Sequence, residues 1–126
     1  MDTQRFTLHE DRDNQQYILT DNSPEGSSTP QLIGLIDYVD AGPLDNERVL
    51  FHTEVNKEYS GQGLAGELAR FAVEVTIDSG KSVVPVCPFV AGWLPRHPEY
   101  APKTVQPEQA HLDAVNEYEQ RRFGGN

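Results

Sequence analysis

Residues 49–80, VLFHTEVNKEYSGQGLAGELARFAVEVTIDSG, contain the three patterns that decide the fold of this chain. An apolar strand comes first, a glycine loop follows at residues 59–65, and an amphipathic segment completes the stretch. Apolar residues recur in that segment at helical spacing, which predicts a helix that ends near Ser79 and Gly80. Because free backbone N–H groups at a helix N-terminus attract anions, the loop predicts binding of a phosphate-bearing ligand.

Strand-like segments lie on both sides of this stretch. With no helical pattern between them, four runs predict an antiparallel meander: residues 5–10, 16–20, 32–39 and 48–55. After the helix, Lys81–Cys87 predicts a short apolar strand, parallel to 48–55 because a crossover helix joins the two. Pro85 removes a ladder donor, so this last strand is expected to be short, irregular or exposed along one side. The predicted fold class is α/β, with an α+β mixed sheet.

The remaining segments are more polar. We expect a mobile loop at Asp21–Pro30 and a helical turn at Phe89–Leu94. Residues 107–123 hold few apolar anchors, which favours a peripheral helix or a partly ordered tail. The predicted organisation is a compact domain at 1–100 and a C-terminal extension at 101–126.

Composition excludes several classes of function. A net charge of −10 argues against a nucleic-acid partner, which requires a basic face. No run approaches the roughly 18 apolar residues of a membrane span, and the N-terminus lacks the apolar stretch of a signal peptide, so we expect a cytoplasmic protein without a membrane partner. A single cysteine and four scattered histidines predict no structural metal.

The acidic charge is uneven along the chain. Residues 1–58 hold twelve acids and four bases, whereas residues 59–126 hold eight acids and six bases. The half with the glycine loop is therefore the less repulsive to a polyanion, and the acidic half would attract a cationic substrate. The simpler interpretation is that the acidity maintains solubility.

The loop fits neither of two common nucleotide-binding motifs. Gly61–Gly66 matches G-x-G-x-x-G, but residues 56–60 separate the strand from the first glycine. The region about 20 residues on, at Val83–Cys87, holds no acid to bind a ribose. A Walker loop is excluded because no Gly-Lys-Ser/Thr follows.

The pattern that survives resembles the GNAT superfamily of acyl-CoA-dependent N-acetyltransferases. The superfamily loop, Arg/Gln-x-x-Gly-x-Gly/Ala, aligns with Ser60–Ala65 and matches at Gly63 and Ala65. Four blocks in order further resemble its small, truncated subfamily, which lacks the last strands of the full fold: Phe51–Val55, Gly61–Ala65, Cys87–Val90 and His97–Tyr100.

This resemblance implies acetyl-CoA as cofactor and a minimal GNAT fold with a V-shaped gap between the parallel strands. The gap would hold the pantetheine arm between Val55 and Val86, and the loop amides would surround the pyrophosphate. The implied cofactor-binding residues are Val55, Ser60, Gly61, Gln62, Gly63, Leu64 and Ala65. The side chains of Lys57, Arg70 and Lys81 either meet the outer phosphates or are solvated surface groups.

The sequence departs from the superfamily pattern at two positions. Ser60 replaces the Arg or Gln of the loop, which removes a long side chain but leaves the N–H groups. The tyrosine that the superfamily uses to protonate the leaving thiolate would fall near Leu94, beside Trp93, which we expect to belong to the core.

Three residues are candidates for the chemistry of acetyl transfer. Cys87, at the end of its strand, is interpreted as a proton donor, a transient acetyl carrier, or a buried and inert thiol. His52 and Glu54 alternate onto one strand face, where one would act as a base or hold the other, or both form an ordinary polar pair.

The leading hypothesis is therefore an acetyl-CoA-dependent N-acetyltransferase with a small-molecule or peptide amine as acceptor. A CoA-binding module with little or no catalysis is the alternative, because the tyrosine is missing. A pure interaction protein is a third class, which would leave the glycine loop unexplained.

Overall fold

The computed structural model describes residues 5–24 and 29–123. A mixed five-stranded sheet in the order β1-β2-β3-β4-β5 forms its centre. In chain order the elements are β1 (Phe6–Asp11), β2 (Gln16–Asp21), β3 (Gln31–Ala41), β4 (Glu47–Val55), η1 (Lys57–Tyr59), α1 (Leu64–Asp78), β5 (Ser82–Pro85), α2 (Pro88–Trp93), η2 (Leu94–Arg96), η3 (Pro98–Lys103) and α3 (Gln109–Phe123).

Strands β1 to β4 pair antiparallel, whereas β5 pairs parallel to β4 after the α1 crossover. The predicted α/β class with its antiparallel meander and final parallel pair is thus confirmed. Strand β5 is short, as Pro85 predicted. The predicted mobile loop at Asp21–Pro30 falls partly on residues 25–28, which lie outside the described residues.

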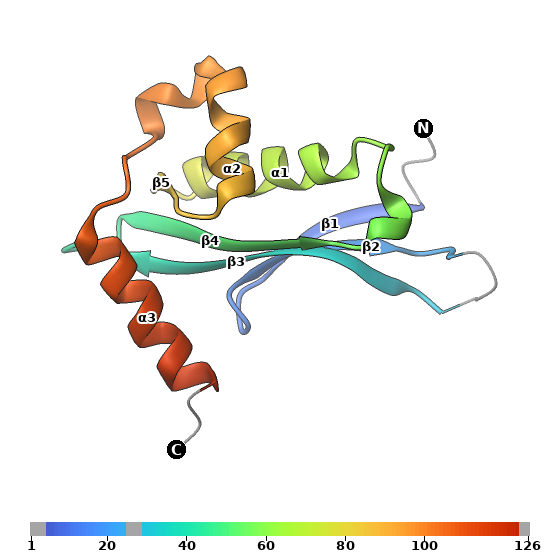
Figure 1. Cartoon of the computed structure of the whole chain (residues 1–126), viewed down its shortest axis with the longest axis horizontal. Helices are drawn as coiled ribbons and strands as arrows, with labels where there is room; N and C mark the ends of the chain where they lie inside the picture. The colour runs from blue at the N-terminus through green and yellow to red at the C-terminus, as the bar shows by residue number, and fades with distance from the viewer. Residues whose placement is uncertain (1–4, 25–28, 124–126) are drawn as a thin grey trace.

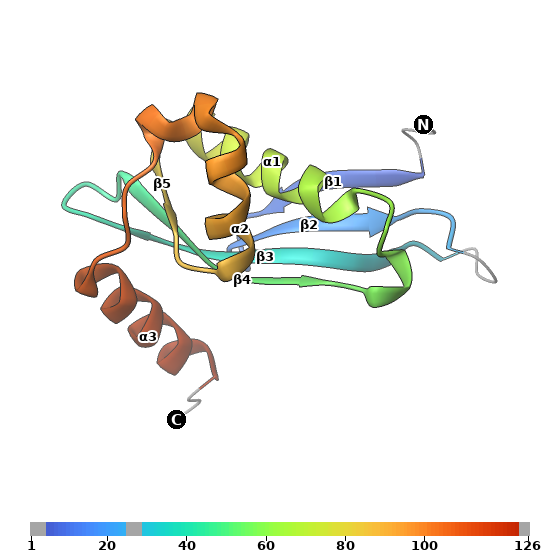
Figure 2. The ribbon, with the colours of Figure 1, turned by 45° about the horizontal axis from the view of Figure 1, so that its top comes forward.

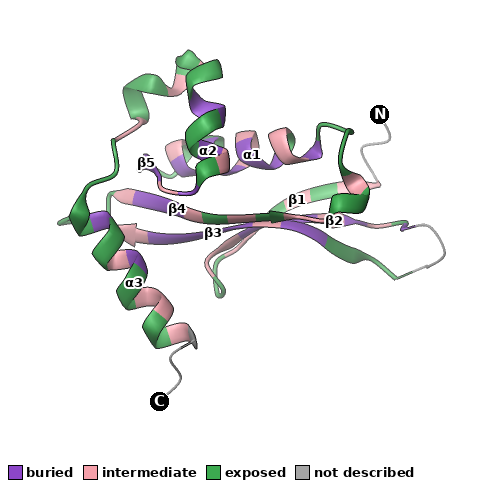
Figure 3. Cartoon of the chain, viewed as in Figure 1, coloured by how far each residue is buried: buried purple, intermediate pink, exposed green. Residues whose placement is uncertain are grey.

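Helices cover both faces of the sheet. Helices α1 and α2 lie on one face, and α3 lies on the other (Figures 1 and 2). The larger core forms under α1 and α2, around Leu50, Leu68 and Trp93. A smaller core joins Val115 of α3 to valines of β3, β4 and β5, and the outer side of α3 stays exposed (Figure 3).

Polar contacts also attach α3 to the sheet. His111 is buried, and its Nε2 lies 2.8 Å from a carboxylate oxygen of Glu47 on β4. Its Nδ1 accepts the backbone N–H of Glu108. Because Nδ1 accepts a hydrogen bond, it carries no hydrogen, and Nε2 is therefore the nitrogen that donates a hydrogen bond to Glu47. The polar segment 109–123 is therefore a helix held by a few specific contacts.

A β-bulge in β4 sets which side chains face the helices. The register between β3 and β4 shifts at Asp37/Tyr38, where Asp37 pairs with His52 and Tyr38 pairs with Leu50. Phe51 is the extra residue, and a one-residue insertion inverts the alternation of all residues beyond it. As a result Thr53 and Val55 lie on the α1 side, while His52 and Glu54 lie on the α3 side.

An ionic cluster fixes the chain just before the glycine loop. The buried Asp21 carboxylate at the end of β2 accepts the Tyr59 hydroxyl at 2.5 Å and two bonds from the Arg5 guanidinium at 3.1 and 3.2 Å. The hydrogen bonds from Arg5, and secondarily from Tyr59, lower the pKa of Asp21 to about 2. The cluster thereby attaches the loop to the other end of the meander.

This lowered pKa predicts acid sensitivity. A carboxyl group whose pKa is lower in the folded state stabilises the fold above its unfolded value near 3.8, and that contribution is lost as the pH falls toward 2. The difference in unfolding free energy between the wild type and Asp21→Asn, from urea titrations, should shrink between pH 5 and pH 2.

Tyr59→Phe should lower the free energy of unfolding at pH 7, because it removes one hydrogen bond to the carboxylate. A constant difference between wild type and Asp21→Asn across this pH range would contradict the assignment.

Candidate functional site

The glycine loop leaves β4 through η1 and enters α1. The Asn56 side chain accepts the N–H of Glu58 at 2.9 Å and caps η1. Gly61 and Gly63 then adopt φ values of 85° and 75°, in the left-handed region that favours glycine. A Cβ atom added at either would meet nothing within 4 Å, so the loop borders open space.

Several amides of this loop are free to bind an anion. The first bond of the α1 ladder runs from the N–H of Glu67 to the carbonyl of Gly63, at 3.1 Å. The N–H groups of the preceding residues in the first turn therefore have no partner within the helix. Gly61, Gln62 and Gly63, directly before this turn, are exposed, so the approach to the turn is open to solvent. An open cradle of this kind fits a phosphate group.

Strands β4 and β5 separate five residues before β4 ends. Their pairing ends at Leu50 and Pro85, and the Leu50 carbonyl accepts the N–H groups of both Val86 (3.0 Å) and Cys87 (2.9 Å). Strand β4 continues for residues 51–55 with β3 as its only strand partner among residues 5–24 and 29–123. This fork, which consists of residues 51–55 and 85–87, offers one unpaired edge of β4 to an extended ligand.

Cys87 lies at the base of the fork. Cys87 occupies the N-cap position of α2 and is 2% exposed. Its Sγ lies 3.2 Å from the Thr53 hydroxyl. Burial raises the pKa of the Cys87 thiol above its ordinary value, although the contact with Thr53 lowers it in part. Cys87 is consequently a protonated thiol at neutral pH, a state suited to donating a proton.

His52 and Glu54 lie close together, but away from Cys87. Their side chains contact at 3.0 Å between Nε2 and a carboxylate oxygen, and both are exposed. The bulge at Phe51 places them on the α3 side of β4, whereas Thr53 and Cys87 lie on the α1 side. The three candidate catalytic residues therefore form two groups, one on each face of the same strand.

Thr53 is a residue that sequence reasoning missed. Alternation along the strand indicates that Thr53 and Val55 share a face. Only the bulge determines that this face is the one with Cys87. A threonine two residues after a bulge has no signature of its own in the sequence.

The three cationic candidates differ in position. Lys81 follows the far end of α1, a 15-residue helix about 22 Å long, and binds the Asp45 carbonyl and Asp40, which excludes it from the loop. Arg70 lies in α1 and donates to the Tyr100 hydroxyl at 2.8 Å. Lys57 lies in η1 beside the loop and is exposed.

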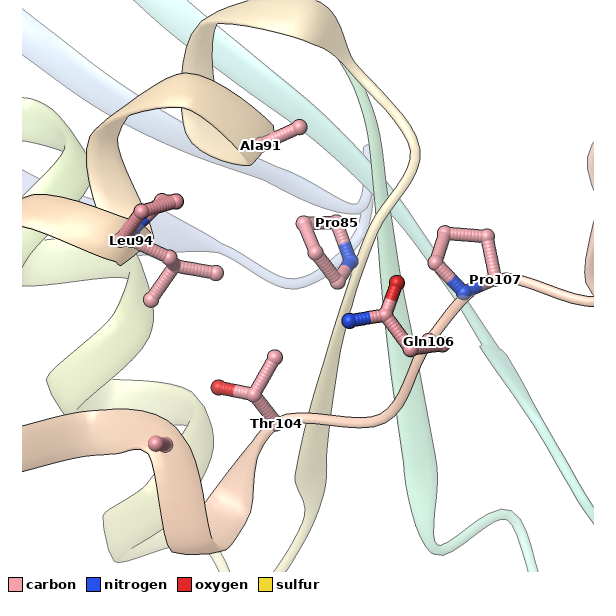
Figure 4. A pocket seen from close by; sticks show the side chains of 8 residues that line it. Pro85, Ala91, Leu94, Thr104, Gln106 and Pro107 are labelled. Atoms are coloured by element: carbon pink, nitrogen blue, oxygen red, sulfur yellow. The ribbon is translucent and has the colours of Figure 1, made fainter. Parts of the chain in front are cut away.

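Two cavities lie outside the gap between β4 and β5, although the first shares Pro85 with the fork. One of about 400 Å³ borders the outer side of β5, between Pro85, Leu94 and Gln106 (Figure 4). Another, of about 460 Å³, surrounds Arg48, which is already bound by Asp40 and Glu10.

A metal site and a membrane-spanning helix are both absent from the described part of the chain. Within residues 5–24 and 29–123, no group of three or more His, Cys, Asp or Glu side chains is arranged to hold a metal ion. None of the helices in this part of the chain has the length and apolar character needed to cross a membrane.

A mixed sheet whose two parallel strands separate, with a glycine loop at a helix N-terminus, is the arrangement that the sequence resemblance implies. The model of the GCN5-related N-acetyltransferase family matches residues 24–103, more than half of the chain. The chain therefore belongs to the GCN5-related N-acetyltransferase (GNAT) family, and the resemblance seen in the sequence is confirmed.

A solved structure supports the fold. The solution structure of a GCN5-like protein from Staphylococcus aureus superposes with a TM-score of 0.56 at 22% identity, covering 88% of this chain and 97% of that one. At this identity the similarity concerns the fold alone. No curated protein matches the chain significantly.

The environment of Cys87 gives a measurable titration. Because the protein has a single cysteine, iodoacetamide alkylation reports on this thiol alone. Alkylation requires the thiolate, so the midpoint of the rate against pH should lie above the value in urea-unfolded protein. Thr53→Val should raise it further by removing the contact that lowers the pKa. A native midpoint below that of the unfolded protein would contradict the assignment.

Proposed function

We propose that this chain is an acetyl-CoA-dependent N-acetyltransferase that acts on an amine of a small molecule or peptide. The observation that carries the proposal is the fork that opens at Leu50, with the glycine loop beside it. Family membership supports the reaction type.

The residues present fit coenzyme A in two respects. The free amides of Gly61 to Ala65 surround an open space, which suits a pyrophosphate. The β4 edge at residues 51–55 offers backbone groups that can pair with the amides of a pantetheine arm, in the manner of an added strand. Both features lie next to each other in the chain, separated only by η1.

Bound acetyl-CoA supplies an activated acetyl group and a thiolate leaving group. The chain's own contribution starts with Cys87, whose raised pKa keeps a proton on Sγ at the base of the fork. This state favours the interpretation of Cys87 as a proton donor over that of an acetyl carrier, which requires the thiolate. The Thr53 hydroxyl holds the thiol in place at 3.2 Å.

The acceptor amine must lose a proton, and the pair on the other face of β4 can accept it. His52 and Glu54 are exposed on the α3 side, and the negative charge of the Glu54 carboxylate favours a cationic amine. Proton removal and proton donation are then divided between the two faces of β4. The acceptor accordingly approaches from the α3 face.

A binding module with little or no catalysis is the second candidate. Leu94, buried at the end of α2, occupies the region where the superfamily has its tyrosine. An acceptor screen separates the two: acetyl-CoA is incubated with polyamines, amino acids and short peptides, and free thiol is measured. Thiol release that depends on one amine class supports the transferase. CoA binding without release for any amine would support the module.

Cys87→Ala should lower the rate of thiol release about 100-fold with little change in CoA affinity by calorimetry, since a general acid contributes on that order. Cys87→Ser should retain more activity, because a hydroxyl can still donate. Unchanged turnover in Cys87→Ala would remove this residue from the chemistry.

A matched pair of glycines tests the loop. Gly63→Val and Gly80→Val place a branched side chain at φ values of 75° and 88°, at opposite ends of α1 and each in open space. Both should lose comparable stability because both strain the backbone. Only Gly63→Val should lose CoA affinity, by tenfold or more in calorimetry, since its Cβ enters the anion cradle. Equal affinities in the two variants would show that the cofactor binds elsewhere.

A further inference from the structure

The indole ring of Trp93, the last residue of α2, is fixed from several sides. Trp93 is 4% exposed. The His97 ring stacks on it with centroids 3.7 Å apart, and the Tyr100 ring lies at 5.8 Å. The Arg70 guanidinium from α1 lies 5.4 Å from the ring centroid. The indole therefore has one defined orientation.

The one polar atom of this buried side chain has no partner. Among residues 5–24 and 29–123, nothing accepts a hydrogen bond from the Trp93 Nε1–H. The atom is nevertheless not sealed, since no fully buried side-chain nitrogen or oxygen in this part of the chain lacks a partner. A buried indole N–H usually finds an acceptor, so this one is available to a ligand.

The free indole N–H lies beside the first turn of α1. A Cβ atom added at Gly66, the third residue of the helix, would lie 3.7 Å from Nε1. Side chains of a helix tilt toward its N-terminus, so this position borders the groove where the free amides of the turn point. Trp93 thus adds a donor from α2 to the donors from α1.

The unpartnered hydrogen-bond donors at this position favour an anion. The unpaired amides and the indole N–H are donors, and the Arg70 guanidinium lies one helical turn further along the same face of α1. Arg70 is already paired with Glu74 and Glu99 at 3.9 Å, so the amides and the indole N–H are the donors left without a partner. A phosphate offers several oxygens that can accept from the amides and the indole together.

We propose that the Trp93 Nε1–H donates a hydrogen bond to a phosphate oxygen of the ligand held at the first turn of α1, which makes Trp93 a cofactor-positioning residue. This inference rests on the proposed function, since it takes the anion to be the diphosphate of coenzyme A. It assigns to the end of α2 a direct part in binding, although Ser60 has replaced a long side chain in the loop itself.

The indole N–H of Trp93 can be observed directly by NMR spectroscopy. Trp93 is the single tryptophan, so a proton–nitrogen spectrum contains one indole N–H signal. Addition of CoA should shift this signal downfield and slow its exchange with water. Adenosine 3′,5′-bisphosphate should reproduce part of the shift, whereas pantetheine, which lacks phosphate, should leave the signal unmoved.

Two variants test the contact: one removes the indole N–H, and the other covers it. Trp93→Phe keeps an aromatic ring but removes the donor, and it should weaken CoA binding about tenfold or more while leaving pantetheine binding unchanged. Gly66→Ala places a methyl group at an ordinary contact distance from Nε1 and covers it. This variant should be more stable than the wild type, because alanine favours the helix, and still bind CoA more weakly.

His97→Phe is the matched control, since it keeps an aromatic ring against the indole and leaves Nε1 free. Its CoA affinity should stay within about twofold of the wild type. CoA binding that is weakened by Gly63→Val but does not shift the indole signal would overturn the role of Trp93. The proposed function would still stand. A wild-type protein that binds no CoA at millimolar concentration would overturn both.

Discussion

The Leu50 carbonyl accepts two amide donors, and the parallel ladder ends at this point. A carbonyl oxygen has two lone pairs, so Val86 and Cys87 can share it, but the chain must turn to bring both amides there. Pro85 contributes to the turn because it has no N–H to offer a continuing ladder. The fork, the start of α2 and the burial of Cys87 all follow from this one junction.

A second constraint acts on the same strand from its other side. The bulge at Phe51 inverts the alternation of β4 immediately after the ladder with β5 ends. Thr53 is thereby brought to Cys87, and His52 and Glu54 are directed to the open face. The division of the candidate chemistry between two faces is therefore a consequence of one inserted residue. Without this inserted residue, His52 and Glu54 would lie on the face covered by α1 and α2.

Much of the fold was predictable because its signals are local. Alternating and helical periodicities, together with glycines at the ends of α1, predicted each strand and the crossover helix. The loop could be predicted for a related reason, since Gly61 and Gly63 with a following amphipathic helix suffice to indicate free amides. The position of α3 on the sheet was not predictable, because its contacts through His111 and Val115 join segments far apart in the chain.

The sequence by itself thus determined the class of the fold, the glycine loop and the family resemblance, because each depends on residues within one short segment. Tertiary structure alone decided which face of β4 each side chain occupies, through a bulge that no residue type marks. It likewise brought Trp93 beside Gly66, where an indole expected only to fill the core keeps its N–H free. Local patterns fix elements, whereas the groups around a site depend on how distant elements pack.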